Sequence, residues 1–417
     1  MAQSAEAEVP GPRTESHPNS PAASEGDEAL AFAPHVSSEP RDEPSPRETA
    51  ADLPSPVPSQ DTNGPTAQSP AEPDAEAEEA PSPFSYLVFA DAYAGVSTNL
   101  AGTGRSPGPT FAFAPENGVG LAFAGADLRY NTRYFGASVD VRAGSAVPVL
   151  LGSDLTVLGA VGLKQAFISL RPVPALRIDA GQFDTIYGAE VSESWLNANY
   201  TRGALYFVAQ PFFHTGLRVN AELPGGIELR ALAVQGWNSV IDNNEGKSFG
   251  AQFAWSGENA SVSAGYIGGP EQASMVEQAR MPGVNGRWRH LVDVVAQLKA
   301  GPVSFLVNAD YIREEVSGGS FSQAYGGMLT LRYGFAPFAI ALRAEVLNDA
   351  DGLFLGVPDM VLGTGTATFE VTPVEGVVLR LDARYDAASD AVFATGADGF
   401  SNDAFRVVLG AVVHSGQ

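Results

Sequence analysis

Apolar and polar residues alternate over many stretches of the chain. In residues 377–386, every second side chain is apolar, and the positions between them are Arg380, Asp382, Arg384 and Asp386. Side chains of a β-strand point alternately to its two faces, so this strand would have one apolar face and one charged face. The same pattern returns at Asp140 and Arg142, Arg177 and Asp179, Glu228 and Arg230, and Arg343 and Glu345. The pattern predicts an all-β protein.

Turn residues divide this region into about 16 predicted strands of roughly ten residues, the length that a tilted membrane strand needs. Short connections built from turn-forming residues alternate with long ones, as in outer-membrane barrels. We therefore expect a closed antiparallel transmembrane β-barrel with its short turns and both termini in the periplasm. The predicted strands are 84–95, 119–130, 134–143, 159–171, 175–184, 212–223, 227–238, 248–257, 260–268, 289–300, 303–315, 323–335, 338–349, 360–372, 376–388 and 403–414.

A soluble β-sandwich could show the same alternation, with its charged face in water. The recurrence of both signs of charge on the polar face favours a barrel with lipid outside and a hydrated lumen inside. A soluble adhesive or structural β-protein is the alternative, and it predicts that residues 84–417 stay dissolved without detergent. Aromatic residues near the predicted strand ends, such as Tyr86, Trp237, Tyr266 and Tyr311, are expected to form girdles at the membrane interfaces.

Composition separates residues 1–83 from the rest of the chain. This segment holds 16 of the 30 prolines, and 17 acidic residues against three arginines. Because it has almost no aromatic residues, it cannot bury enough surface to offset its ordering entropy. We expect residues 1–83 to be a disordered acidic tail and residues 84–417 to form the barrel domain. The absence of cysteine excludes a disulfide scaffold, and no apolar run is long enough for a membrane helix.

No signal peptide is visible, because neither a basic nor an apolar segment follows Met1. An outer-membrane protein must be exported. We therefore expect either that Met1 was added to a processed chain or that the natural start lies upstream.

Several short motifs lie between Gly181 and Trp255. They are Gly181-Gln182-Phe183, Gly188-Ala189-Glu190, Asn199-Tyr200-Thr201-Arg202, Gln210-Pro211, His214-Thr215-Gly216, Gly236-Trp237-Asn238, Asp242-Asn243-Asn244 and Lys247-Ser248. These motifs resemble the signature region of the OmpL-like β-barrel porins of bacterial outer membranes. The resemblance implies an outer-membrane pore for passive diffusion of small hydrophilic solutes or ions, without catalytic residues.

The connection 185–211 is the longest, and it contains apolar and aromatic side chains such as Tyr187 and Trp195. It is the third outer loop, which in general porins folds into the lumen. We expect it to form a pore constriction with Asp184, Glu190, Glu193 and Arg202, although a solvated surface loop is the alternative. Acidic loop residues such as Asp242 and Asp349 predict a pore that prefers cations to anions. The predicted pore lining is Asp140, Arg142, Arg177, Asp179, Glu228, Arg230, Arg343, Glu345, Arg380, Asp382, Arg384 and Asp386.

The main rival function is an outer-membrane esterase or phospholipase, in which His214 and a nearby serine would lie on the barrel exterior. Residues 246–250 match G-x-S-x-G, but they lead from a loop into a predicted strand, whereas that motif needs a strand-to-helix turn. We therefore expect no enzyme activity.

We also expect no metal and no cofactor. The acidic segments 242–245 and 348–352 could hold calcium, but turn formation explains their composition. The expected partners are outer-membrane lipid and small solutes or ions, with no nucleic acid. A homotrimer would suit a barrel of this size.

Overall fold

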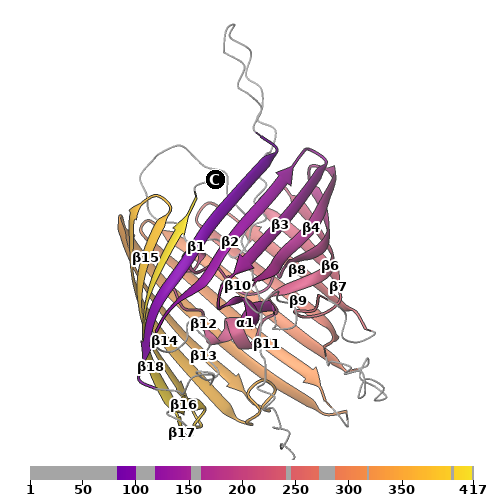
Figure 1. The fold of residues 1–417 in the computed structure, drawn as a ribbon. Coiled ribbons are helices and arrows are strands. Elements are labelled where there is room, and N and C mark those ends of the chain that lie inside the picture. Colours follow the sequence, from indigo (N-terminus) through magenta and orange to yellow (C-terminus); the bar gives the residue numbers. More distant parts are fainter. Residues whose placement is uncertain are drawn as a thin grey trace, which may run out of the picture. The chain divides into compact units, whose positions relative to one another are not determined.

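Sixteen strands close into one antiparallel barrel, in which β1 pairs with β18 (Figure 1). The computed structural model describes residues 82–99, 118–151, 161–240, 246–271, 287–316, 319–395 and 399–415. Nearly all of the predicted tail 1–83 lies outside these residues. The barrel strands are β1 (Phe84–Ser97), β2 (Gly118–Asn131), β3 (Phe135–Ala143), β4 (Val161–Val173), β5 (Leu176–Asp184), β6 (Phe213–Leu223), β7 (Ile227–Val234), β8 (Ser248–Ser256), β9 (Ala260–Pro270), β10 (Trp288–Ala300), β11 (Val303–Glu315), β12 (Phe321–Phe335), β13 (Phe338–Asp349), β14 (Met360–Val374), β15 (Val377–Ala388) and β18 (Asp403–His414).

Each predicted strand has a counterpart in the barrel, so the predicted fold class is confirmed. The largest difference is at β7, which ends at Val234 rather than at residue 238. Asn238 has a φ angle of 52°, in the left-handed region, which an extended strand does not adopt. Trp237 therefore lies in the interior, where it is 8% exposed, and its prediction as a girdle residue was wrong.

The wall of the barrel is apolar outside and polar inside. On β13, Leu342 is 51% exposed whereas its neighbour Arg343 is 2% exposed. Leu381 and Asp382 on β15 show the same contrast, with exposures of 46% and 0%. This arrangement is the reverse of a soluble sandwich and suits a sheet that faces lipid, because closure leaves no strand edge unpaired in hydrocarbon.

The long connections contain elements that the alternation does not predict. They are the helices α1 (Val147–Leu151) and α2 (Ala204–Val208), the 3-10 helix η2 (Ser194–Leu196), and the hairpin of β16 (Phe393–Thr395) and β17 (Gly399–Ser401). In Figure 1 this hairpin lies at the lower end of the barrel, opposite the end that carries the C-terminus. None of the helices among the described residues is long and apolar enough to cross a membrane.

Candidate pore constriction

The twelve predicted lining residues all lie on barrel strands. Their side chains are largely buried, on the same side of each strand as the barrel interior. They occur on β3, β5, β7, β13 and β15. The polar face that the alternation predicted is therefore the inner face of the wall.

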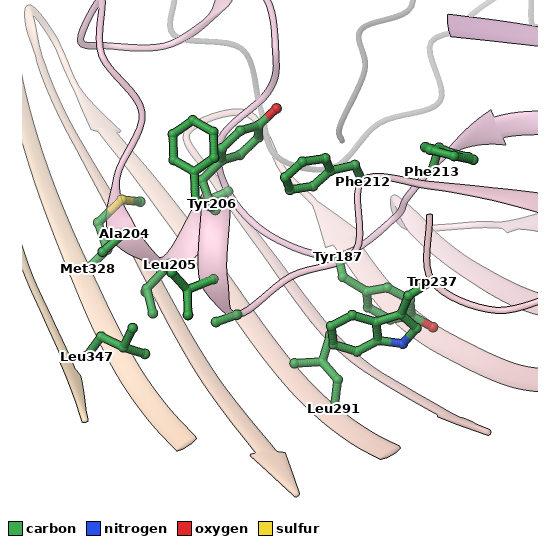
Figure 2. Close-up of a cluster of buried hydrophobic side chains, with 14 of the residues drawn as sticks. Tyr187, Ala204, Leu205, Tyr206, Phe212, Phe213, Trp237, Leu291, Met328 and Leu347 are labelled. Atoms are coloured by element: carbon green, nitrogen blue, oxygen red, sulfur yellow. The ribbon is translucent and has the colours of Figure 1, made fainter. Parts of the chain in front are cut away.

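Residues 185–211, which we call the inner segment, fold into the barrel between β5 and β6. Almost every side chain of the segment is buried, including all residues of α2. Figure 2 shows Leu205 of α2 beside the wall residues Met328 and Leu347, in agreement with the contacts of α2 with β12 and β13. The Tyr206 and Phe212 rings stack with their centroids 5.0 Å apart. The alternative of a solvated surface loop was thus wrong for this connection.

The charges of β15 hold the backbone of the inner segment. Asp382 accepts hydrogen bonds from the backbone N–H of Tyr200 at 3.2 Å and from the N–H of Thr201 at 2.8 Å. The Thr201 hydroxyl donates to the same carboxylate at 2.9 Å. Two arginines on either side of Asp382 donate to backbone carbonyl oxygens of the segment: Arg380 to Ser194 and Arg384 to Arg202. One strand therefore supplies both acceptors and donors to the docked backbone.

The charges of β13 hold the next part of the segment. Glu345 accepts hydrogen bonds from the backbone N–H groups of Ala204 at 3.1 Å and Leu205 at 3.4 Å. These groups lack partners within α2, because the first N–H groups of a helix have none. Arg343 donates to the Glu190 carboxylate and to the Thr201 carbonyl oxygen.

Glu193 fixes the segment to the other side of the barrel. Its carboxylate pairs with Arg142 of β3 at 2.8 Å and with Lys164 of β4 at 2.5 Å. Burial alone would raise the pKa of Glu193, but these two cations outweigh it and hold the pKa below its ordinary value. Glu193 is therefore an ionised anchor rather than a free charge facing solvent.

The inner segment also contacts three more strands of the wall. Gly188 N–H donates to Asp293 of β10 at 3.1 Å, and Ala189 N–H donates to Asn308 of β11 at 3.2 Å. On the opposite side, Asp91 of β1 accepts from the Ser194 hydroxyl at 2.7 Å and from the Tyr200 hydroxyl at 2.8 Å. The inner segment is thus tied to β1, β3, β4, β10, β11, β13 and β15, and it crosses the interior from wall to wall.

The four predicted constriction residues have different environments. Glu190 and Glu193 bind wall cations, whereas Arg202 donates to the carbonyl oxygens of Val191, Ser192 and Tyr200 and so fastens the segment to itself. Asp184 is the last residue of β5 and is 2% exposed. Neither of its carboxylate oxygens has a hydrogen-bond partner among the described residues.

Sequence reasoning missed an apolar layer inside the barrel. Leu291 lies opposite Ile267 and Ile312 in the sheet register, and Leu347 lies opposite Leu362. All five side chains are fully buried. Four of them, all except Ile267, lie one inward-facing position nearer to the long loops than a polar wall residue. The signal was present in the sequence, because an open hydrated lumen would not need apolar residues at these inward positions.

Glycines on the inner wall were also missed, and they let aromatic rings of the segment approach the sheet. A Cβ atom at Gly410 of β18 would lie 2.2 Å from the Tyr200 ring. One at Gly265 of β9 would lie 2.6 Å from the Tyr187 ring. These positions cannot take a larger side chain while the segment stays docked.

We expect Gly410→Val to loosen the inner segment. The valine would displace the Tyr200 ring and its hydrogen bond to Asp91, and such overpacking typically costs about 1–3 kcal/mol. Single-channel recordings should then show larger or less steady currents than the wild type. Gly365→Val is the matched control, because Gly365 points outward and a Cβ there would meet nothing within 4 Å. Identical recordings from the two variants would contradict this role of Gly410.

The residues required by the rival enzyme do not form a catalytic site on the exterior. His214 is fully buried, and its ring nitrogens lie 3.1 Å from the Thr185 hydroxyl and 3.0 Å from the Gly236 carbonyl oxygen. Ser248, the serine of G-x-S-x-G, is the first residue of β8 and donates to Glu271. The motif thus enters a strand, as the sequence predicted.

The two acidic segments considered for calcium have separate outcomes. Asp349 accepts hydrogen bonds from the backbone N–H groups of Leu353, Phe354 and Leu355, which is turn formation rather than an open ligand set. Residues 242–245 lie outside the described residues. Within the described part of the chain, no group of three or more His, Cys, Asp or Glu residues could hold a metal ion.

A family model described as "Putative beta-barrel porin-2, OmpL-like" matches residues 86–414. The match therefore extends over the whole barrel, well beyond the motifs between Gly181 and Trp255. No curated protein matches the chain.

Solved structures of outer-membrane channels share the fold. The anion-selective porin from Comamonas acidovorans superposes with a TM-score of 0.56 at 11% identity, covering 80% of this chain and 99% of that one. The outer membrane channel DcaP of Acinetobacter baumannii gives a TM-score of 0.56 at 14% identity, covering 80% and 97%. OmpF of Salmonella typhi gives 0.51 at 14% identity, with the same coverage.

Proposed function

The chain belongs to the family of OmpL-like β-barrel porins of the outer membrane, and we propose that its inner segment is the constriction that small solutes and ions must pass. The observation that carries the proposal is the set of contacts that tie the segment to opposite sides of the barrel, to Asp91 of β1 and to Asp293 of β10, with Glu193 and Asp382 adding further ties to the wall. Passive diffusion needs only a hydrated path past this segment, without cofactor or turnover.

In this proposal Asp184, Glu190, Glu193 and Arg202 determine the width and charge of the constriction. Half of the twelve predicted lining residues act first as docking groups, because they contact the segment directly: Arg142, Arg343, Glu345, Arg380, Asp382 and Arg384. Others, such as Arg230 with Glu228, pair with each other along the wall. Wide solutes would then be excluded while the segment is docked.

Ion preference and assembly are further parts of the proposal. Burial raises the pKa of Glu190, while Arg343 partly offsets this effect. A modest preference for cations remains our prediction, and so does a homotrimer.

Planar-bilayer recording of the refolded full chain tests the proposal. We expect discrete conductance steps that are small for a barrel of sixteen strands. In a salt gradient, the reversal potential should have the sign that a preference for cations gives. A refolded barrel that gives no steps would instead be a plugged or structural barrel. Turnover of an ester or phospholipid that is lost in His214→Ala would support the enzyme rival and contradict the non-enzymatic part of the proposal.

A further inference from the structure

The lipid-facing wall carries a basic side chain at one position of the described strands. Arg313 lies on β11 between the buried residues Ile312 and Glu314, and it is exposed like its outward neighbour Tyr311. The other lysines and arginines on the described barrel strands occupy inward-facing positions. A cation on this face is costly at the middle of a bilayer and costs little near its interface.

Arg313 is at the interface rather than at the middle. It is two residues from the end of β11 at Glu315, where the long outer connection begins. Tyr311 and Tyr325 lie opposite each other one outward position away from it. Outward-facing tyrosines near strand ends mark the level of the lipid headgroups in membrane barrels.

Two polar side chains accompany Arg313 on the same outward row. His290 of β10 and Gln323 of β12 lie opposite Arg313 in the sheet register, one on each side. The Tyr266 hydroxyl lies 2.7 Å from His290 Nδ1 and fixes the ring. We call Arg313, His290 and Gln323 the basic row.

The guanidinium of Arg313 is held in place, but its N–H donors have no hydrogen-bond acceptor among the described residues. It lies over the Phe321 ring, 3.6 Å from the centroid. An aromatic face attracts the cation but leaves the five N–H donors of a guanidinium without oxygen acceptors. Among the described residues, none accepts a hydrogen bond from Arg313. Glu315 lies on the next outward position, and it is the acidic group that an incoming ligand would meet there.

We propose that the basic row binds the phosphate group of a lipid in the outer leaflet. Two oxygens of a phosphate can accept hydrogen bonds from the planar fork of a guanidinium, and the imidazole and amide on the neighbouring strands add donors on either side. The surrounding rings of Phe321, Tyr266 and Tyr311 would contact the upper part of the acyl chains. This inference rests on the outer-membrane location and not on conduction through the inner segment.

Lipid titration of the refolded full chain in zwitterionic detergent tests the proposal. Native mass spectrometry would follow binding of short-chain phosphatidic acid, with phosphatidylcholine of the same chain length as the neutral probe. We expect Arg313→Gln to weaken phosphatidic acid binding about tenfold, a loss of one strong hydrogen-bonded contact. The affinity of Arg313→Lys for phosphatidic acid should lie between those of the wild type and Arg313→Gln, because lysine keeps the charge but lacks the planar fork of donors.

Arg133→Gln is the matched control. Arg133 also lies beside an aromatic ring, 5.2 Å from the Tyr134 centroid, but in the short turn at the other end of the barrel. It should bind phosphatidic acid as the wild type does. Equal affinity in Arg313→Gln and wild type would overturn the proposal, and so would an equal loss in both arginine variants. A change in protomer number in Arg313→Gln would overturn it too, by making the row a protein interface. If Arg313→Gln does not fold, Arg313→Lys carries the comparison.

Discussion

Replacing residues 186–211 by a short Asn-Gly turn is expected to raise the single-channel conductance several-fold. The replacement is feasible because Asp184 lies opposite Phe213 in the register, and Thr185 N–H donates to the Phe212 carbonyl oxygen at 2.9 Å. An Asn-Gly turn can join strands paired in this way. Removal of the inner segment would leave the wall charges of β13 and β15 in water, where they need no protein partner. The largest sugar that enters liposomes carrying the barrel should increase in size as well.

The shortened barrel must first be shown to fold. A folded barrel changes its gel mobility when the sample is heated, so unheated and heated samples are compared. A folded barrel with wild-type conductance would mean that the segment does not limit the path. Unchanged sugar exclusion combined with higher ion conductance would place the size limit elsewhere, for example at the apolar layer around Leu291 and Leu347.

The barrel could be predicted from the sequence because the pattern that specifies it lies within each strand. Each strand must place apolar side chains on lipid and polar side chains inside, so alternation such as that around Arg380 reports the fold without knowledge of any distant contact. Turn residues then fix the strand limits to within a few residues. The exception at Trp237 follows the same logic, because the left-handed backbone at Asn238 ends the alternation.

The path of the inner segment could not be predicted in the same way. Its contacts join residues far apart in the chain, such as Ala189 with Asn308 and Tyr200 with Asp382. Alternating charges on β15 are compatible both with a wet wall and with a docking surface, and the sequence does not distinguish these two roles. The aromatic composition of 185–211 indicated that the segment lies inside the barrel, but it did not indicate which strands hold it.

Asp382→Asn is expected to undock part of the inner segment, whereas Asp386→Asn should not. The two aspartates are fully buried on the inner face of the same strand. Asp382 accepts two backbone N–H groups and a hydroxyl from the segment. Asp386 accepts side-chain hydrogen bonds among the described residues from Arg384 and Arg406 and none from the segment, and Arg384 uses a different nitrogen for its hydrogen bond to the Arg202 carbonyl oxygen. The pair therefore separates loss of a buried carboxylate from loss of docking.

An asparagine at position 382 keeps one acceptor oxygen and places an NH2 group where the second oxygen was. One of the donors at Tyr200 and Thr201 then loses its acceptor, which weakens docking by about 2 kcal/mol and increases the undocked population on the order of 30-fold. Single-channel recordings of Asp382→Asn should show frequent transitions to a higher conductance, while Asp386→Asn should resemble the wild type. If both variants show the same transitions, the cause is disturbance of the charged wall, and Asp382 has no special role in docking. If neither does, the contacts through Glu193 and Glu345 hold the segment without Asp382.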